Sequence, residues 1–258
     1  MRHRAFSEDV LEYRSCETVL IGNRDLGLFG VAVGMPEDGG QQTWRQDGHG
    51  LSYRWRFPEG VEVRFRVEPA GDHLALTYSI VNLTESVLDR LHVHPCVITT
   101  EAPSFRGDAE KTIRDDEEYS DRDLRFAEMY SRLTLWSAGE QFTFASLPQS
   151  RTENHLSVMA RGEPPINWAW WRNADVTFDE PFISLQSDRA KGTLALWFER
   201  ASWASANVGD DRCCFHLFPT WSRLGAGECR TLRGALFWTT DDLDRVRRGV
   251  STLSSQRP

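Results

Sequence analysis

The sequence has no long apolar run. No stretch approaches the roughly 20 consecutive apolar residues that a membrane-spanning helix needs. Residues 1–9 include basic side chains, but no apolar segment follows them, so they do not resemble a secretory signal peptide. We therefore expect a cytoplasmic chain without a membrane partner.

Cysteine is scarce and irregularly placed. An odd count of five without regular spacing does not predict a disulfide framework, and the two adjacent cysteines lack the spacing of a zinc knuckle. We expect these cysteines to be small buried apolar side chains in strands. They are Cys16, Cys96, Cys213, Cys214 and Cys229.

Basic clusters and the common catalytic motifs are also missing. The net charge is −8, and nucleic acid is excluded as a partner because binding it depends on neutralising phosphates. The sequence contains no Gly-x-Ser-x-Gly, phosphate-binding loop, dinucleotide fingerprint or His-Glu-x-x-His. These absences argue against triad hydrolases, kinases and nicotinamide enzymes.

The sequence is rich in segments that alternate apolar and polar residues with a period of two, which is typical of strands with one buried face. Short polar turns separate them, as between 51–57 and 61–67. This spacing predicts an all-β fold, a large antiparallel β-sandwich, in a single domain of residues 1–258. The expected strands are 18–22, 27–34, 51–57, 61–67, 73–81, 87–98, 133–136, 141–146, 182–186, 193–199, 213–218 and 229–238, the last two flanking the turn 223–228.

Two segments depart from this alternation. Residues 101–130 are charged, most densely at 114–123, and indicate an exposed insertion or a lid over a site. Near the C-terminus, Thr240 can cap a short helix over 241–248, which has acidic residues first and arginines last.

The sharpest candidate site is the segment from Arg90 to His94. On a strand, Arg90, His92 and His94 lie on one face, about 7 Å apart, because alternate residues share a face. Two imidazoles and a guanidinium can bind a carboxylate or sugar hydroxyls, supply a general acid, or contribute two ligands to a metal. The alternative is that they are polar residues on a solvated face.

A metal at His92 and His94 needs a third ligand. Glu101, His155 and His216 are candidates, but none has a diagnostic spacing. A cupin places a glutamate a few residues after His-x-His, whereas Glu101 comes late, so that interpretation ranks lower.

A second candidate site contains Trp168, Trp170 and Arg172, in a sequence with ten tryptophans. If this segment is extended, Trp168 and Trp170 share a face and can stack on a sugar ring, with Arg172 nearby for its hydroxyls. Trp221 can serve the same stacking role. The alternative is an aromatic core cluster.

A third candidate is His216, which alternates with Phe215 and Leu217 and so faces away from them. A lone histidine in a strand is more often a hydrogen-bonded structural residue than a catalyst. Its interest depends on which side chains it lies beside.

Residues 74–84, which end in Asn82-Leu83-Thr84, and residues 91–96, which contain His94-Pro95, resemble the galactose mutarotase-like (aldose 1-epimerase) superfamily. Residues 224–228, followed by a strand over 229–238, look like the closing hairpin of that superfamily. The resemblance implies a large twisted sandwich, or supersandwich, that binds a sugar or oligosaccharide on a concave sheet.

The resemblance also implies roles for the histidines. His94 would protonate the sugar ring oxygen, and His92 would be a neighbouring binding residue. The sequence departs from the superfamily at two places: residues 214–219 hold no carboxylate where a glutamate is expected, and Cys96 replaces the aromatic residue after His-Pro.

The missing base leaves alternatives. His216 can replace the glutamate, Glu180 or Glu199 can reach in from elsewhere, or the chain only binds sugar.

Three functions therefore remain open. The first is an enzyme without a cofactor, an isomerase or lyase that acts on a sugar by proton transfer between His94 and a second base. The second is a non-catalytic carbohydrate-binding sandwich. The third is a metal-dependent enzyme or sensor that uses His92 and His94 as ligands. The oligomeric state is not predicted.

Overall fold

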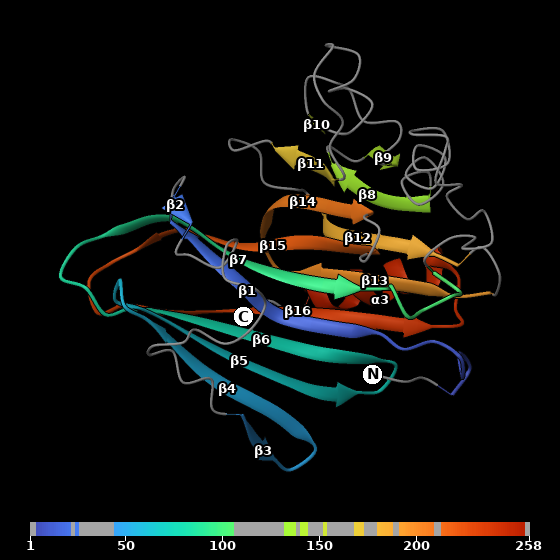
Figure 1. Ribbon diagram of the computed structural model, residues 1–258, viewed down its shortest axis with the longest axis horizontal. Coiled ribbons are helices and arrows are strands. Elements are labelled where there is room, and N and C mark those ends of the chain that lie inside the picture. Colours follow the sequence, from blue (N-terminus) through green and yellow to red (C-terminus); the bar gives the residue numbers. More distant parts are fainter. Residues whose placement is uncertain are drawn as a thin grey trace, which may run out of the picture.

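The computed structural model describes residues 4–21, 24–25, 44–105, 132–137, 140–143, 152–153, 168–172, 180–187, 191–208 and 213–255; the side chains of 17–18, 24–25, 137, 140, 152–153, 168–172, 203 and 207–208 are left aside. In this part of the chain, two antiparallel sheets pack against each other, and helix α3 covers the outside of one of them (Figure 1). The predicted antiparallel β-sandwich with a C-terminal helix is confirmed. None of the helices described here has the length and apolar character to cross a membrane.

The two sheets have seven and nine strands, and all their pairings are antiparallel. The seven-stranded sheet contains, in order, β10 (Thr152–Glu153), β11 (Trp168–Arg172), β14 (Ala201–Val208), β15 (Cys213–Leu224), β7 (Leu88–Ile98), β1 (Glu12–Ile21) and β2 (Arg24–Asp25). The nine-stranded sheet contains β3 (Arg45–Asp47), β4 (Gly50–Phe57), β5 (Val61–Ala70), β6 (His73–Asn82), β16 (Cys229–Thr239), β13 (Thr193–Phe198), β12 (Glu180–Gln186), β8 (Leu133–Ser137) and β9 (Glu140–Thr143).

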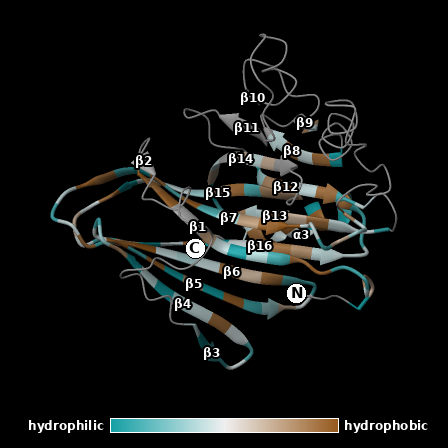
Figure 2. Cartoon of the chain, viewed as in Figure 1, coloured by the Kyte–Doolittle hydropathy of each residue, from teal (hydrophilic) through white to brown (hydrophobic). Residues whose placement is uncertain are grey.

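The hairpin predicted between 51–57 and 61–67 forms, because residues of the turn itself favour it. Strands β4 and β5 pair from Leu51↔Val67 to Phe57↔Val61, and their alternating hydropathy is visible in Figure 2. Gly60 closes the turn at φ 80°, a left-handed conformation that side chains disfavour. A Cβ there would also lie 2.6 Å from Thr84 Cγ2, so the turn requires glycine.

The main core lies between the sheets. Strands β5, β6, β7 and β15 contribute Phe65, Tyr78, Val93 and Phe215, all at most 2% exposed. Burying each such side chain contributes about 1.5–3 kcal/mol. This core uses every second residue of each strand, so the outer faces of both sheets remain available for other interactions.

The two patches that resemble the mutarotase-like superfamily meet at one corner. Buried Asn82 accepts hydrogen bonds on Oδ1 from the backbone and hydroxyl of Thr84 at 2.9 and 2.7 Å. Its Nδ2 donates to the carbonyls of Leu224 and Gly225 at 3.2 and 2.9 Å. Asn82 therefore joins the end of β6 to the turn between β15 and β16, which is a structural role.

The predicted closing hairpin is wrong. Strand β15 continues through Pro219 to Leu224 and belongs to the seven-stranded sheet, whereas β16 belongs to the nine-stranded sheet. The turn around Gly227, with φ 68°, carries the chain from one sheet to the other. The sequence shows the turn but cannot show that the two strands pair with different neighbours.

Helix α3 (Leu243–Ser255) is confirmed in kind, but its predicted bounds of 241–248 are wrong. Asp242 caps it, not Thr240, because Asp242 Oδ1 accepts a hydrogen bond from Arg245 N at 2.8 Å. The helix runs further because Val246 and Val250 are buried against the outer face of the nine-stranded sheet.

The predicted exposed insertion at 101–130 is wrong at its beginning. Ala102 and Phe105 are fully buried in the main core, because these apolar side chains complete it beyond the end of β7. Residues 106–130, including the acidic segment 114–123, lie outside the described residues, as does the expected strand 27–34. Strand β14, which was not predicted, lies beside β15.

Candidate functional site

The histidines lie on the outer face of the seven-stranded sheet. In β7, Leu91 and Val93 point into the core, so His92 and His94 occupy the opposite face, as the alternation predicted. His92, His94 and His216 are 4%, 2% and 1% exposed. The expected open surface is therefore not present in this structure: the imidazoles are buried.

His92 is held by two hydroxyl groups. Its Nδ1 lies 2.9 Å from both Ser202 Oγ and Thr220 Oγ1, which are 2.7 Å apart. Thr220 donates its hydroxyl proton to the carbonyl of Phe218 at 3.0 Å. These contacts are all satisfied when Ser202 donates to Thr220 and His92 Nδ1–H donates to the hydroxyl oxygens. The network thus favours the tautomer with a proton on Nδ1 and leaves Nε2 as the acceptor nitrogen.

Burial keeps His92 neutral. Desolvation, and secondarily the positive charge of Arg90, lower the pKa of His92 from 6.5 to about 4. At neutral pH the ring therefore carries no charge, and Nε2 can accept a hydrogen bond.

His94 lies between two rings. It stacks on Phe218 with centroids 4.5 Å apart and meets the edge of His216 at 4.4 Å. Burial, followed by the nearby His216, holds the pKa of His94 well below 6.5. A neutral imidazole dominates at neutral pH, which disfavours the imidazolium proton donor that the mutarotase resemblance implies.

His216 bonds through both ring nitrogens. Its Nδ1 is 2.7 Å from Ser205 Oγ, and its Nε2 is 3.0 Å from Cys96 Sγ. Ser205 is opposite His216 in the pairing of β14 with β15. The structure thus brings His216 to His94, as required if the two act together, but joins it to a thiol rather than to a carboxylate.

The carboxylates considered as a base are held elsewhere. Glu180 bonds Arg247 of α3 through both oxygens at 2.9 Å, and Glu199 bonds the backbone of Arg233 at 2.9 Å. Each therefore has an arginine as its ion-pair partner. The expectation that Glu180 or Glu199 reaches His94 is not supported by these contacts.

The other predicted binding residues are dispersed. Arg90 is exposed near the start of β7 and has φ 53°. Trp221 is 4% exposed and belongs to the main core, so it is not available to stack on a ligand at the histidine face. This corrects its predicted role: Trp221 pairs with Leu91, and both face inward.

The tryptophan segment is extended, as the second candidate site requires. It forms β11, where Trp170 pairs with Ser205, and Arg172 with Trp203, of β14. The side chains of Trp168, Trp170 and Arg172 are among those left aside, so their stacking role stays a prediction.

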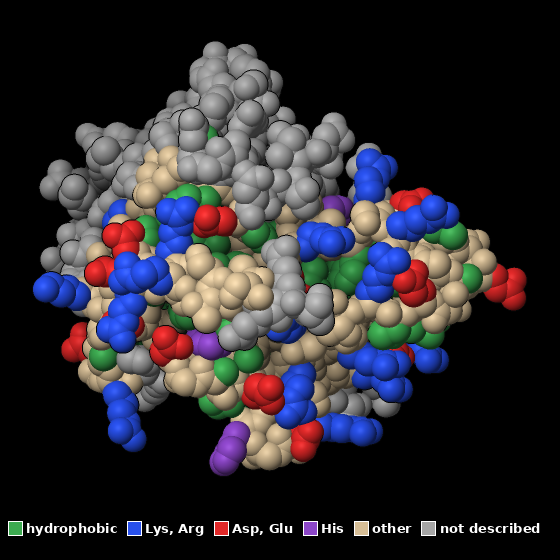
Figure 3. All heavy atoms as spheres, turned by 180° about the vertical axis from the view of Figure 1, so that it is seen from behind, with side chains coloured by type: hydrophobic (Ala, Val, Ile, Leu, Met, Phe, Trp, Pro, Cys, Tyr) green, Lys and Arg blue, Asp and Glu red, His purple; other side chains and the backbone are tan. Residues whose placement is uncertain are grey.

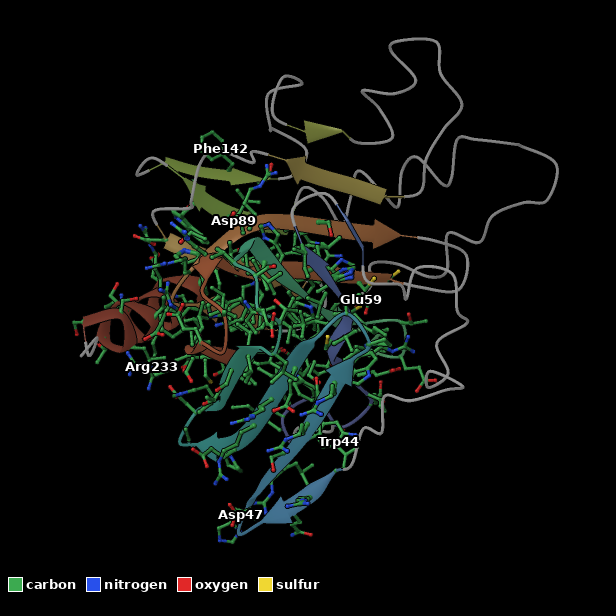
Figure 4. The ribbon with its side chains drawn as sticks, turned by 90° about the vertical axis from the view of Figure 1, so that its left-hand side faces the viewer. Trp44, Asp47, Glu59, Asp89, Phe142 and Arg233 are labelled. Atoms are coloured by element: carbon green, nitrogen blue, oxygen red, sulfur yellow. The ribbon has the colours of Figure 1, made fainter. Side chains whose placement is uncertain are left out.

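A cleft of about 420 Å³ opens at the seam between the sheets and shares Thr220 with the surroundings of His92. Strand β13 ends at Phe198, opposite Gly234, and none of the described strands pairs with residues 229–232 of β16 on that side. Figure 4 labels Arg233 on the side that carries α3. The lining residues are Glu199, Arg200, Thr220, Trp221, Arg230, Thr231, Leu232 and Arg233.

The sequence interpretation missed a group of metal-ligating atoms. Cys96, Cys214 and His216 are buried, and their ligand atoms all lie within 4.8 Å of one another. This grouping includes His216, one of the third ligands considered for a metal at His92 and His94, and it lies beside two cysteines; that pair of histidine ligands itself stays a prediction. The available signal was His94-x-Cys96 in one strand and Cys214-x-His216 in another, which become neighbours when the strands pair antiparallel.

Comparison with known proteins returns structural matches only. No family model matches the chain, and no curated protein matches it. Among solved structures, the Slr1438 protein from Synechocystis sp. PCC 6803 matches at 12% identity and TM-score 0.44, covering 77% of this chain and 66% of that one, just under two thirds.

Two further matches carry mutarotase or epimerase names. A galactose mutarotase related enzyme from Lactobacillus acidophilus matches at 11% identity and TM-score 0.40, covering 78% of this chain and 72% of that one. The GalM/aldose epimerase homologue from C. elegans matches at 8% identity and TM-score 0.42, covering 88% and 79%. Galactose mutarotase-like structures are thus among the matches, at low sequence identity.

Proposed function

We propose that this chain binds a small sugar or oligosaccharide at the histidine face of the seven-stranded sheet, with His92 and His94 as contact residues. Because these side chains are only 4% and 2% exposed, binding requires this face to open locally. The observation that carries the proposal is the convergence of imidazole and hydroxyl groups from β7, β14 and β15 on one face, while the other face forms the core. Sugar hydroxyls both donate and accept hydrogen bonds, and these groups complement them.

In this proposal His92 and His94 make different contacts with the sugar. His92, fixed by Ser202 and Thr220, offers an acceptor nitrogen to a sugar hydroxyl. His94, stacked on Phe218, adds a flat ring whose nitrogens bond a second hydroxyl. Because His92 and His94 are neutral at neutral pH, the step proposed for this face is proton removal by an imidazole, as an isomerase or lyase acting on carbohydrate requires.

Sugar binding is tested by saturation-transfer NMR on the full chain with a panel of aldoses, uronic acids and short oligosaccharides. We expect saturation transfer to at least one sugar class, weakened about 5–10-fold by His94→Gln and by His92→Gln, as the loss of a hydrogen bond predicts. His73→Gln on β6, in the other sheet, is the matched control and leaves binding unchanged. Equal transfer in all variants, or none in the wild type, contradicts the proposal.

Catalysis is tested separately on the same samples. Anomeric exchange is measured by NMR for the sugar that binds. Exchange that His94→Gln abolishes, with binding retained, supports the isomerase. Binding without exchange leaves the carbohydrate-binding part standing and rejects the mutarotase part.

A second candidate, a non-catalytic carbohydrate-binding sandwich, is favoured by the cleft at the seam. Guanidinium and hydroxyl groups there can bond sugar oxygens, and its volume suits a small ligand. Here Arg200→Ala weakens binding and His94→Gln does not. Arg45→Ala, on the exposed edge strand β3, is the matched control.

A further inference from the structure

Two thiols and an imidazole meet on the histidine face. Phe215 pairs with Val97 in the antiparallel register of β15 and β7, and one pair further along this register sets Cys96 opposite His216. Cys214 lies two residues before His216 on the same strand, so it shares that face. All three side chains are at most 2% exposed.

We propose that Cys96, Cys214 and His216 bind a Zn²⁺ ion. Their ligand atoms lie within 4.8 Å of one another, and His216 Nε2 is 3.0 Å from Cys96 Sγ. Zinc bonds of about 2.3 Å to sulfur and about 2.0 Å to nitrogen place tetrahedral ligand atoms roughly 3.5–3.8 Å apart. The largest adjustment needed is therefore about 1 Å, within the reach of side-chain rotation.

The hydrogen bonds around His216 suit a metal ligand. Ser205 Oγ lies 2.7 Å from Nδ1 and can accept a hydrogen bond from Nδ1–H. The lone pair of Nε2 is then directed toward Cys96. Metal-bound histidines are usually oriented in this way by a partner on the other nitrogen. Zinc would take the place of the Cys96 thiol proton, and binding releases one proton from each cysteine.

Charge also favours zinc at this position. Two thiolates in an apolar setting beside Ile98 would be costly to bury, whereas Zn²⁺ neutralises both. Soft thiolate ligands select zinc or copper(I) over the hard cations. Strands hold all three ligands, which limits their movement.

This inference goes beyond the proposed sugar function, because the ion is held by residues that do not need a sugar to be present. Three protein ligands leave one tetrahedral position for a further ligand, as in zinc sites that perform chemistry. The site is also adjacent to the proposed sugar contacts, since the His94 ring meets the edge of His216.

The test begins with the reduced, metal-free wild-type chain titrated with Co²⁺. We expect one Co²⁺ per chain, with visible bands of a tetrahedral ion and a near-ultraviolet thiolate-to-cobalt charge-transfer band. Added Zn²⁺ should abolish both. No charge-transfer band, or a Cys96–Cys214 disulfide that forms equally with and without Zn²⁺, overturns the proposal without any variant.

Variants identify the ligands. Cys96→Ser, Cys214→Ser and His216→Gln should each weaken zinc binding strongly, and each cysteine change should reduce the charge-transfer band. Ser205→Ala removes only the orienting group and should weaken binding about 10–100-fold. Cys213→Ser, adjacent in sequence but outside the group, is the matched control; a band that survives in both Cys96→Ser and Cys214→Ser overturns the assignment.

Discussion

The outer faces of the two sheets are buried in different ways. On the nine-stranded sheet, Trp197 and Phe237 lie under α3, where Val246 and Val250 complete an apolar cluster. On the seven-stranded sheet, histidine, serine, threonine and cysteine side chains are buried instead. Apolar burial stabilises without directional requirements, whereas each buried polar group must find a partner or lose stability. The second face therefore retains groups that can recognise a ligand or an ion.

The remainder of the nine-stranded sheet shows a third solution, ion pairing. Glu62, buried on β5, lies within 3.4 Å of arginines on β4 and β5. Figure 3 shows basic (Lys or Arg) and acidic side chains next to one another on the side seen from behind. These arginines are 47–64% exposed, whereas the side chain of Glu62 is 1% exposed, so they neutralise a buried carboxylate from the solvent side. They are Arg54, Arg56 and Arg64.

The largest expected loss of stability comes from removing an apolar side chain under α3. Phe237→Ala should lower the free energy of unfolding by about 3–5 kcal/mol, because it removes a buried aromatic ring and leaves a cavity under α3. Urea denaturation followed by circular dichroism measures it. Leu51→Ala, at a side chain 46% exposed, is the control and should change stability by less than about 0.5 kcal/mol. Similar losses in both variants would reject the distinction.

An intermediate effect is expected on the histidine face, where burial of His92 makes stability depend on pH. His92 has a pKa of about 4 in the folded chain against 6.5 ordinarily. Above pH 6.5 both states are neutral and stability is full. Between pH 6.5 and 4 the unfolded chain binds a proton that the folded chain does not. Stability should therefore fall by about 3 kcal/mol in total over this window, with no further loss from His92 below it.

The groups around His92 make this assignment testable. Arg90 is the charged neighbour, while β14 and β15 present the hydroxyls of Ser202 and Thr220, and β1 presents Leu20 in register. His92→Gln should reduce the slope of stability against pH between pH 6.5 and 4, and the lowered pKa of His94 accounts for a share of the slope that remains. His49→Gln, on the exposed turn before β4, should leave the slope as in the wild type; identical slopes in all three chains would sink the prediction.

The smallest effect concerns how α3 is attached. Arg247 forms two hydrogen bonds of 2.9 Å with Glu180 and lies over the Trp136 ring. Arg247→Lys loses the two-pronged geometry, and since both partners are 37% exposed the cost should be only about 0.5 kcal/mol. Thermal unfolding compares it with Arg248→Lys, an exposed neighbour. A loss above about 2 kcal/mol would show that this ion pair, not the apolar cluster, holds the helix.

Local features were predictable because neighbouring residues create them. Gly60 indicated the β4–β5 turn, and the alternation of His92 with Leu91 and Val93 indicated that the histidine faces away from the core. The bounds of α3 were less predictable, because burial of Val250 against the sheet extends the helix beyond its acidic and basic signals.

The sequence by itself determined the β-rich composition of the fold, its local hairpins and the side of β7 on which the histidines lie. Only the tertiary structure decided that β15 and β16 join different sheets, that Trp221 is a core residue, and that Cys96 meets His216 from 120 positions away. The physical reason is that alternation fixes the face of a strand, whereas the neighbour and register of a strand depend on long-range pairing of the whole sandwich.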